Sequence, residues 1–156
     1  MDELVKIILI DDDEVDREAI MRALKEAKIP NPVIMANDGV EALELLRGEA
    51  GSSPIPQPYL ILLDLNMPRM GGVRFLRELR ADPRTRGSVV LVLTTSNSDH
   101  DRFEVYDLNV AGFITKANAA KDFSLLAKFL DIYWQIVEFP PSDVVLDDTF
   151  ATSRLS

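Results

Sequence analysis

The sequence VKIILIDDDEVDREAI at residues 5–20 decides the fold. It opens with consecutive apolar residues, which are typical of a strand buried on both faces of a parallel sheet. Asp11, Asp12 and Asp13 follow, and either Asp12 or Asp13 can cap a helix whose apolar positions recur at helical spacing through Ala27. The stretch therefore predicts a strand, an acidic turn and a helix, which together begin a βαβ unit.

The rest of the chain repeats this alternation. Further short aliphatic or β-branched runs stand at residues 32–36, 59–63, 89–93 and 110–114. Helical patterns separate or follow them, around residues 42–46 behind a capping box of Asp38 and Glu41, and at residues 72–80, 99–108 and 119–138. We expect an α/β three-layer sandwich, with a five-stranded parallel sheet in the flavodoxin-like order 2-1-3-4-5 and five helices.

The length and the end of the chain predict its domain organisation. With 156 residues, of which 47% are hydrophobic, the chain can bury one core without disulfides or metals. Residues 1–138 are predicted to form the domain. Residues 139–156 read as a polar C-terminal tail, with no output domain.

The composition excludes several classes of function. The chain has no cysteine and a single histidine, which removes thiol chemistry and zinc-finger sites. The net charge of −9 and a pI near 4.6 argue against a nucleic-acid surface. No apolar run approaches the roughly 20 residues of a membrane span. We therefore expect a cytoplasmic protein with neither a nucleic-acid nor a membrane partner.

Acidic residues gather where the predicted strands end. In the expected strand order the first and third strands are neighbours, so Asp11, Asp12 and Asp64 should converge at the carboxyl edge of the sheet. Two like charges about 4 Å apart repel by roughly 4 kcal/mol at an effective dielectric near 20, so the cluster calls for a cation. An all-oxygen donor set suits Mg²⁺. With Thr94 and Lys116 on the opposite rim, the pocket predicts phosphoryl transfer to a carboxylate.

These segments resemble the receiver domains of two-component response regulators. The resemblance is carried by IILIDDDEVDREAI, ANDGVEALELL, LILLDLNMPRMGG, VVLVLTTS and AGFITK. It implies that Asp64 accepts the phosphoryl group and that Asp12 binds Mg²⁺ directly, with Asp11 close to the ion. It also implies further site residues: a metal-binding carbonyl at Asn66, a phosphoryl contact at Lys116, and a switch pair at Thr94 and Phe113.

Within that family the chain resembles the stand-alone receivers that work with bacterial and cyanobacterial phytochromes. A sensor histidine kinase, here a bacteriophytochrome, is then the expected partner. The signal would leave by protein–protein contact, and the domain would be no enzyme beyond promoting its own phosphorylation and slow dephosphorylation. One departure from the family pattern is Ala117, which follows Lys116 where a proline is usual.

The last predicted helix is apolar around an unusually wide arc. At 100° per residue, one stripe comprises Leu125, Phe129, Ile132 and Ile136, and a second stripe lies about 100° away. One stripe should face the sheet, and the other is free for a symmetric homodimer. We predict a dimer interface made by Leu126, Leu130, Tyr133, Trp134 and Val137.

Two other functions remain compatible with parts of the pattern. Asp11 and Asp13 after the first strand mimic the nucleophile and acid of haloacid-dehalogenase-type phosphatases, although the later acidic pair that such enzymes need is found only at Asp147 and Asp148. A receiver-like interaction module that no longer takes phosphate is the other alternative, and Ala117 is its main support.

Overall fold

The fold was analysed in a computed structural model. It describes residues 4–49, 51, 53–65, 70–94, 105–116 and 123–136, with the backbone alone at Thr94. The described elements, in chain order, are β1 (Lys6–Ile10), α1 (Glu14–Glu26), β2 (Val33–Ala36), α2 (Gly39–Arg47), β3 (Tyr59–Asp64), α3 (Gly72–Ala81), β4 (Val89–Thr94), β5 (Gly112–Thr115) and α5 (Ser124–Ile136).

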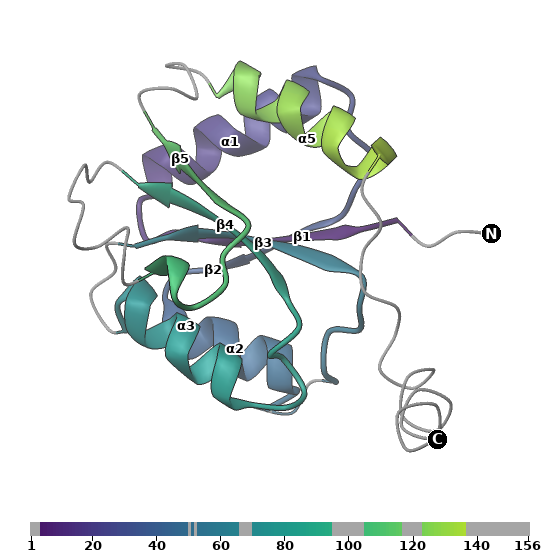
Figure 1. The fold of residues 1–156 in the computed structure, drawn as a ribbon. Coiled ribbons are helices and arrows are strands. Elements are labelled where there is room, and N and C mark those ends of the chain that lie inside the picture. The colour runs from purple at the N-terminus through teal and green to yellow at the C-terminus, as the bar shows by residue number, and fades with distance from the viewer. Residues whose placement is uncertain are drawn as a thin grey trace.

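The strands form one parallel sheet in the order β2-β1-β3-β4-β5, so the predicted fold class and strand order are confirmed. Helices α1 and α5 cover one face of the sheet, and α2 and α3 cover the other (Figure 1). Each face has its own apolar core, and β1, β3 and β4 contribute alternate residues to both. This two-sided burial explains why those strands are apolar at consecutive positions.

The predicted helix starts are confirmed where side chains cap them. Asp13 caps α1, because its carboxylate accepts hydrogen bonds from the amides of Val15 and Asp16 at 2.9 and 3.3 Å. Asp38 caps α2 by accepting from the amide of Glu41 at 2.9 Å. Most of the predicted helix at 99–108 lies outside the described residues.

Two predicted boundaries are wrong, and a left-handed residue stands near each. Asn109 has a φ of 59° after the preceding turn, Val110 is buried in the core, and β5 begins at Gly112. Phe123 has a φ of 60°, which cannot lie inside a right-handed helix. Helix α5 therefore begins at Ser124, five residues later than predicted.

The predicted dimer stripe is also corrected by the structure. Leu126 and Leu130 are only 2% and 0% exposed, because they face the sheet and pack into the same core as residues of α1. Tyr133 and Trp134 are half-buried, and Val137 lies outside the described residues. The open stripe is the other one, formed by Leu125, Phe129, Ile132 and Ile136. Both stripes are apolar, so only the docking of α5 on the sheet could decide which one is buried.

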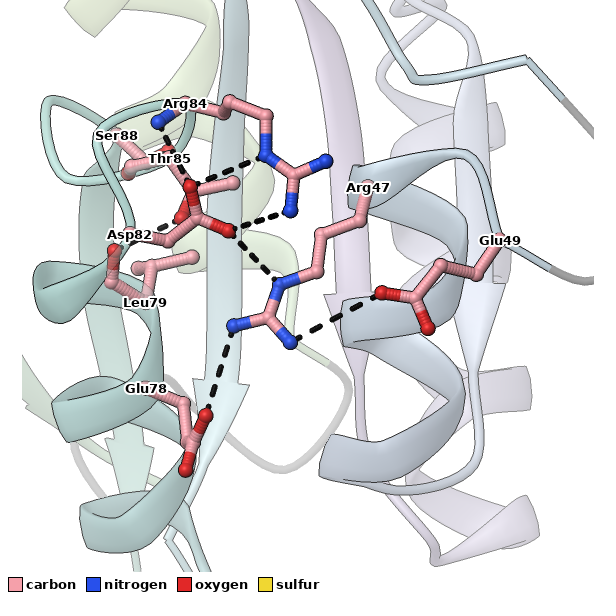
Figure 2. Close-up of polar contacts among 8 residues, drawn as sticks. All are labelled: Arg47, Glu49, Glu78, Leu79, Asp82, Arg84, Thr85 and Ser88. Atoms are coloured by element: carbon pink, nitrogen blue, oxygen red, sulfur yellow. Dashed lines mark hydrogen bonds and ion pairs between the residues drawn. The ribbon is translucent and has the colours of Figure 1, made fainter.

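The ends of α2 and α3 are joined by a cluster of charges (Figure 2). Arg47 Nε lies 3.1 Å from Asp82 Oδ2, and Arg47 Nη2 lies 3.5 Å from Glu78 Oε2. Arg84 reaches the same Asp82 carboxylate with two hydrogen bonds, at 3.1 and 2.9 Å. Both helices end here, far from the strand ends that carry Asp11 and Asp64, so we assign this cluster to stability.

The charge cluster predicts a pH-dependent contribution to stability. Hydrogen bonds from Arg84, with the charge of Arg47, lower the pKa of Asp82 from 3.8 to about 2. Asp82→Asn should lower stability by about 1 kcal/mol, or about 2–4 °C in Tm. The difference from wild type should be full above pH 3.8 and vanish as the pH falls through 2, since the wild-type carboxyl is then protonated too.

Thermal melts from pH 7 down to pH 2 measure this difference. The exposed Glu26 at the end of α1 provides the control, because Glu26→Gln removes the same charge away from the cluster. A difference between Asp82→Asn and wild type that stays constant down to pH 2 would contradict the prediction.

Candidate functional site

Three carboxylates meet at the carboxyl edge of the sheet. Ile10 of β1 pairs with Leu63 of β3, so the residues that follow them, Asp11 and Asp64, are neighbours. With Asp12 they offer ligand oxygens that all lie within 4.8 Å of one another. Asp11 is fully buried and Asp64 is 5% exposed, whereas Asp12 is exposed to solvent. The predicted convergence is confirmed, and one side of the cluster is open to solvent.

The turn after β1 is held by its own hydrogen bonds. Asp11 Oδ1 accepts from the amide of Asp13 at 2.9 Å, which fixes the carboxylate that points into the cluster. Arg17, one turn into α1, donates to the Asp11 carbonyl at 3.2 Å and to the side chain of Asn37 after β2. The acidic turn is therefore tied to both α1 and the end of β2.

The start of α3 lies close to the residue that follows β3. The amide of Gly72, at the start of α3, donates to the Leu65 carbonyl at 3.0 Å. A Cβ on Gly72 would lie 2.7 Å from the Cα of Leu65, so only glycine fits at this contact. The contact holds the start of α3 against the backbone that follows Asp64.

Lys116 brings the compensating positive charge from the carboxyl end of β5, an edge strand of the sheet. It directly follows β5 and is mostly buried, with 13% of its side chain exposed. Its Nζ lies 3.5 Å from Asp11 Oδ2 and 3.8 Å from Asp64 Oδ2, and it forms an ion pair with Asp16 of α1. The structure thus places Lys116 at the acidic cluster, as the sequence predicted.

Burial and neighbouring charges shift the pKa values of Asp11 and Lys116 in opposite directions. Burial raises the pKa of Asp11, although the Asp13 amide and the Lys116 ammonium oppose the rise. Burial by itself would lower the pKa of Lys116, but the hydrogen bond to Asp16 and the charges of Asp11 and Asp64 outweigh it, so that pKa is raised. The site therefore holds an ammonium and a neighbouring carboxyl group whose pKa values are both raised.

The donor set fits a hard divalent cation. Carboxylate oxygens from three residues, one of them solvent-exposed, match the preference of Mg²⁺ or Mn²⁺ for oxygen ligands and retained water. A bound cation would also remove the repulsion among the buried acids. Asn66, whose carbonyl the resemblance assigns to the metal, lies outside the described residues.

The remaining predicted residues lie nearby along the sheet. Thr94 ends β4 and pairs in register with Thr115 of β5, while its side chain lies outside the described part of the chain. Phe113 lies in β5, half-buried, and its ring meets that of Tyr106 edge-on with centroids 4.9 Å apart. Their proposed roles as switch residues stay predictions.

Sequence reasoning missed Asp16 and Tyr106. A signal for Asp16 was available, because it stands four residues after Asp12, one helical turn away at the start of α1. Tyr106 gave no such signal, since its contact with Phe113 spans the turn at Asn109.

Known proteins resemble this chain in both sequence and architecture. The sequence model of the response regulator receiver domain matches residues 7–128. The chain therefore belongs to the response regulator receiver domain family, whose members are signalling domains of two-component systems. Among the described residues, no helix is both long and apolar enough to cross a membrane.

The similar proteins include several phytochrome response regulators. The response regulator Rcp1 of Synechocystis is 32% identical over 128 residues, covering 82% of this chain and 87% of that protein. The Mn²⁺-bound form of Rcp1 has a TM-score of 0.76, covering 87% of this chain and 99% of that one. Phosphorylated RcpA, a cyanobacterial phytochrome response regulator, is 34% identical with a TM-score of 0.80, covering 89% and 100%. The bacteriophytochrome response regulator RtBRR is 33% identical with a TM-score of 0.70, covering 89% and 85%.

The acidic cluster predicts stabilisation by divalent cations. Adding Mg²⁺ or Mn²⁺ should raise Tm, with a gain of about 2.7 kcal/mol at a hundredfold excess over Kd. Asp11→Asn should weaken the cation's affinity by at least about tenfold, because it removes one charged ligand from the cluster. Thermal melts over a cation titration measure both effects. Asp107→Asn, which alters an exposed acid elsewhere, is the control and should behave as wild type.

Proposed function

We propose that this receiver takes a phosphoryl group from a sensor histidine kinase onto Asp64, in a magnesium-dependent reaction, and signals by protein–protein contact. The observation that carries the proposal is the position of Asp64, which ends β3 nearly buried, with Asp11, Asp12 and Lys116 around its carboxylate. Neither alternative function is favoured by any contact in the described residues.

The residues of the chain have distinct tasks in this reaction. An oxygen of Asp64 attacks phosphorus, so that an O–P bond forms while the bond from phosphorus to the kinase histidine nitrogen breaks. Lys116 offsets negative charge on the phosphoryl oxygens, and Asp11 and Asp12 with Asp64 would hold Mg²⁺. When bound, Mg²⁺ supplies positive charge that offsets the carboxylates and the incoming phosphoryl group. The Asn66 carbonyl is the further ligand that the family resemblance proposes.

The proposed switch lies between this site and the surface. Thr94 would contact the phosphoryl group, and Phe113 would change its packing in response. Phe113 contacts Tyr106, which is 53% exposed, and lines an apolar groove beside α5. A change in Phe113 would therefore alter the surface that a partner meets.

We further propose that the partner kinase is a bacteriophytochrome and that the protein acts in the cytoplasm. Support comes from the similarity to RcpA and RtBRR, which are described as phytochrome and bacteriophytochrome response regulators.

Phosphorylation is tested by intact-mass analysis after incubation with acetyl phosphate, with and without Mg²⁺. Wild type should gain one phosphoryl group only with Mg²⁺, Asp64→Ala should gain none, and Asp11→Asn should react more slowly. An adduct on Asp11 would indicate the phosphatase class instead. No adduct from either acetyl phosphate or a kinase, with the fold intact, would favour the interaction module.

The open stripe of α5 is the proposed surface for a homodimer. Leu125, Phe129, Ile132 and Ile136 are 55%, 42%, 59% and 77% exposed. Beside them lies a groove of about 450 Å³, which Phe113 and Leu125 help to line. Continuous exposed apolar faces of this kind commonly mark protein–protein contact sites. A second copy of the chain fits because the same face can pack on itself.

The dimer proposal predicts that one charge on this face separates the copies. Ile132→Glu should convert a dimer to a monomer in light scattering of the full chain, with the fold retained. Leu4→Glu, which changes an exposed leucine outside any element, should leave the mass unchanged. A monomeric wild type, with or without acetyl phosphate, would contradict the proposal and leave the tail at 139–156 as the candidate cover.

A further inference from the structure

Lys116 has three acidic neighbours, and its nearest partner is not the proposed phosphoacceptor. Its Nζ pairs with Asp16 of α1, and the distances to Asp11 and Asp64 are longer, at 3.5 and 3.8 Å. The Lys116 and Asp16 side chains are 13% and 23% exposed, so the pair is only partly screened by solvent. The Lys116 ammonium therefore pairs more closely with Asp16 than with Asp11 or Asp64.

Asp16 lies beside the acidic cluster without being one of its converging ligands. It lies on the first turn of α1, and its amide donates to the capping carboxylate of Asp13 at 3.3 Å. It is not among the acids whose oxygens converge, which are Asp11, Asp12 and Asp64. Its side chain forms an ion pair with Lys116, so Asp16 acts on the site chiefly through the lysine.

An incoming phosphoryl group needs the same ammonium. A lysine ammonium has three donor hydrogens on a compact charge, and two anions on different sides compete for its position. In the structure Lys116 is paired with Asp16 and lies 3.8 Å from Asp64 Oδ2, so phosphoryl oxygens arriving at Asp64 meet an ammonium that is already shared.

We propose that Asp16 is a positioning residue that shares Lys116 with Asp11 and Asp64 in the resting protein and competes with the phosphoryl group for it. The inference rests on the proposed function, and it makes Asp16 a restraint on phosphorylation. Removing the Asp16 charge should strengthen phosphoryl binding, whereas the rate at saturation should change little because the reacting groups are untouched.

The test measures initial phosphorylation rates against acetyl phosphate concentration at saturating Mg²⁺. Asp16→Asn should lower the KM for acetyl phosphate by about fivefold, the factor expected for one competing ion pair, with kcat within about twofold. Asp16→Glu, which keeps the charge, should stay close to wild type. Glu18→Gln removes the same charge from an exposed site on α1 and controls for a general electrostatic effect.

A second pair of variants isolates the lysine. In a Lys116→Met background, adding Asp16→Asn should leave the residual reaction unchanged, because nothing remains to be released. A KM that falls equally in that background, or equally with Glu18→Gln, would overturn the competition. A rise in KM for Asp16→Asn would also overturn it, since Asp16 would then be aligning the lysine rather than restraining it.

The two proposals fail in different ways. If wild type takes no phosphoryl group at Asp64, the proposed function fails and the inference falls with it. If wild type reacts while Asp16→Asn matches it in KM and kcat, only the role of Asp16 is refuted. A melt of each variant confirms that the fold is retained before rates are compared.

Discussion

The structure depends on how it tolerates buried like charges at one edge of the sheet. Asp11 and Asp64 lie side by side at the ends of β1 and β3 and are almost fully buried. Carboxylates in such a position repel each other and resist ionisation unless positive charge is near. Lys116 supplies part of that charge from the end of β5, beyond β4. A cation is the natural complement, which ties metal binding and phosphoryl transfer to the same geometry.

Helices on both faces of the sheet help to hold that edge in place. Helix α1 contributes the cap at Asp13 and the lysine partner Asp16 from one face. Helix α3 approaches from the other face, through the glycine contact at Gly72. The charges that join α2 to α3 lie far from this edge. The reactive and stabilising charges are thus separated, so each can be changed without the other.

The outer face of α5, by contrast, exposes apolar rather than charged side chains. Leu126 and Leu130 complete the core under α5, while Phe129 and Ile132 remain exposed. Phe113 of β5 helps to line the groove beside this face, and its ring contacts that of Tyr106. In the proposed switch, a change at Asp64 would reach a partner on α5 through Phe113.

The sequence alone determined the buried parallel strands, the cap at Asp38 and, in the expected strand order, the convergence of Asp11, Asp12 and Asp64. These follow from local rules, since buried parallel strands are continuously apolar and their carboxyl ends share one edge. Tertiary structure decided which stripe of α5 is buried, because both stripes are apolar and only packing against the sheet selects one. It also decided the pairing of Asp16 with Lys116, since the spacing from Asp12 places Asp16 near the acidic turn but does not show which residue a hundred positions away it contacts.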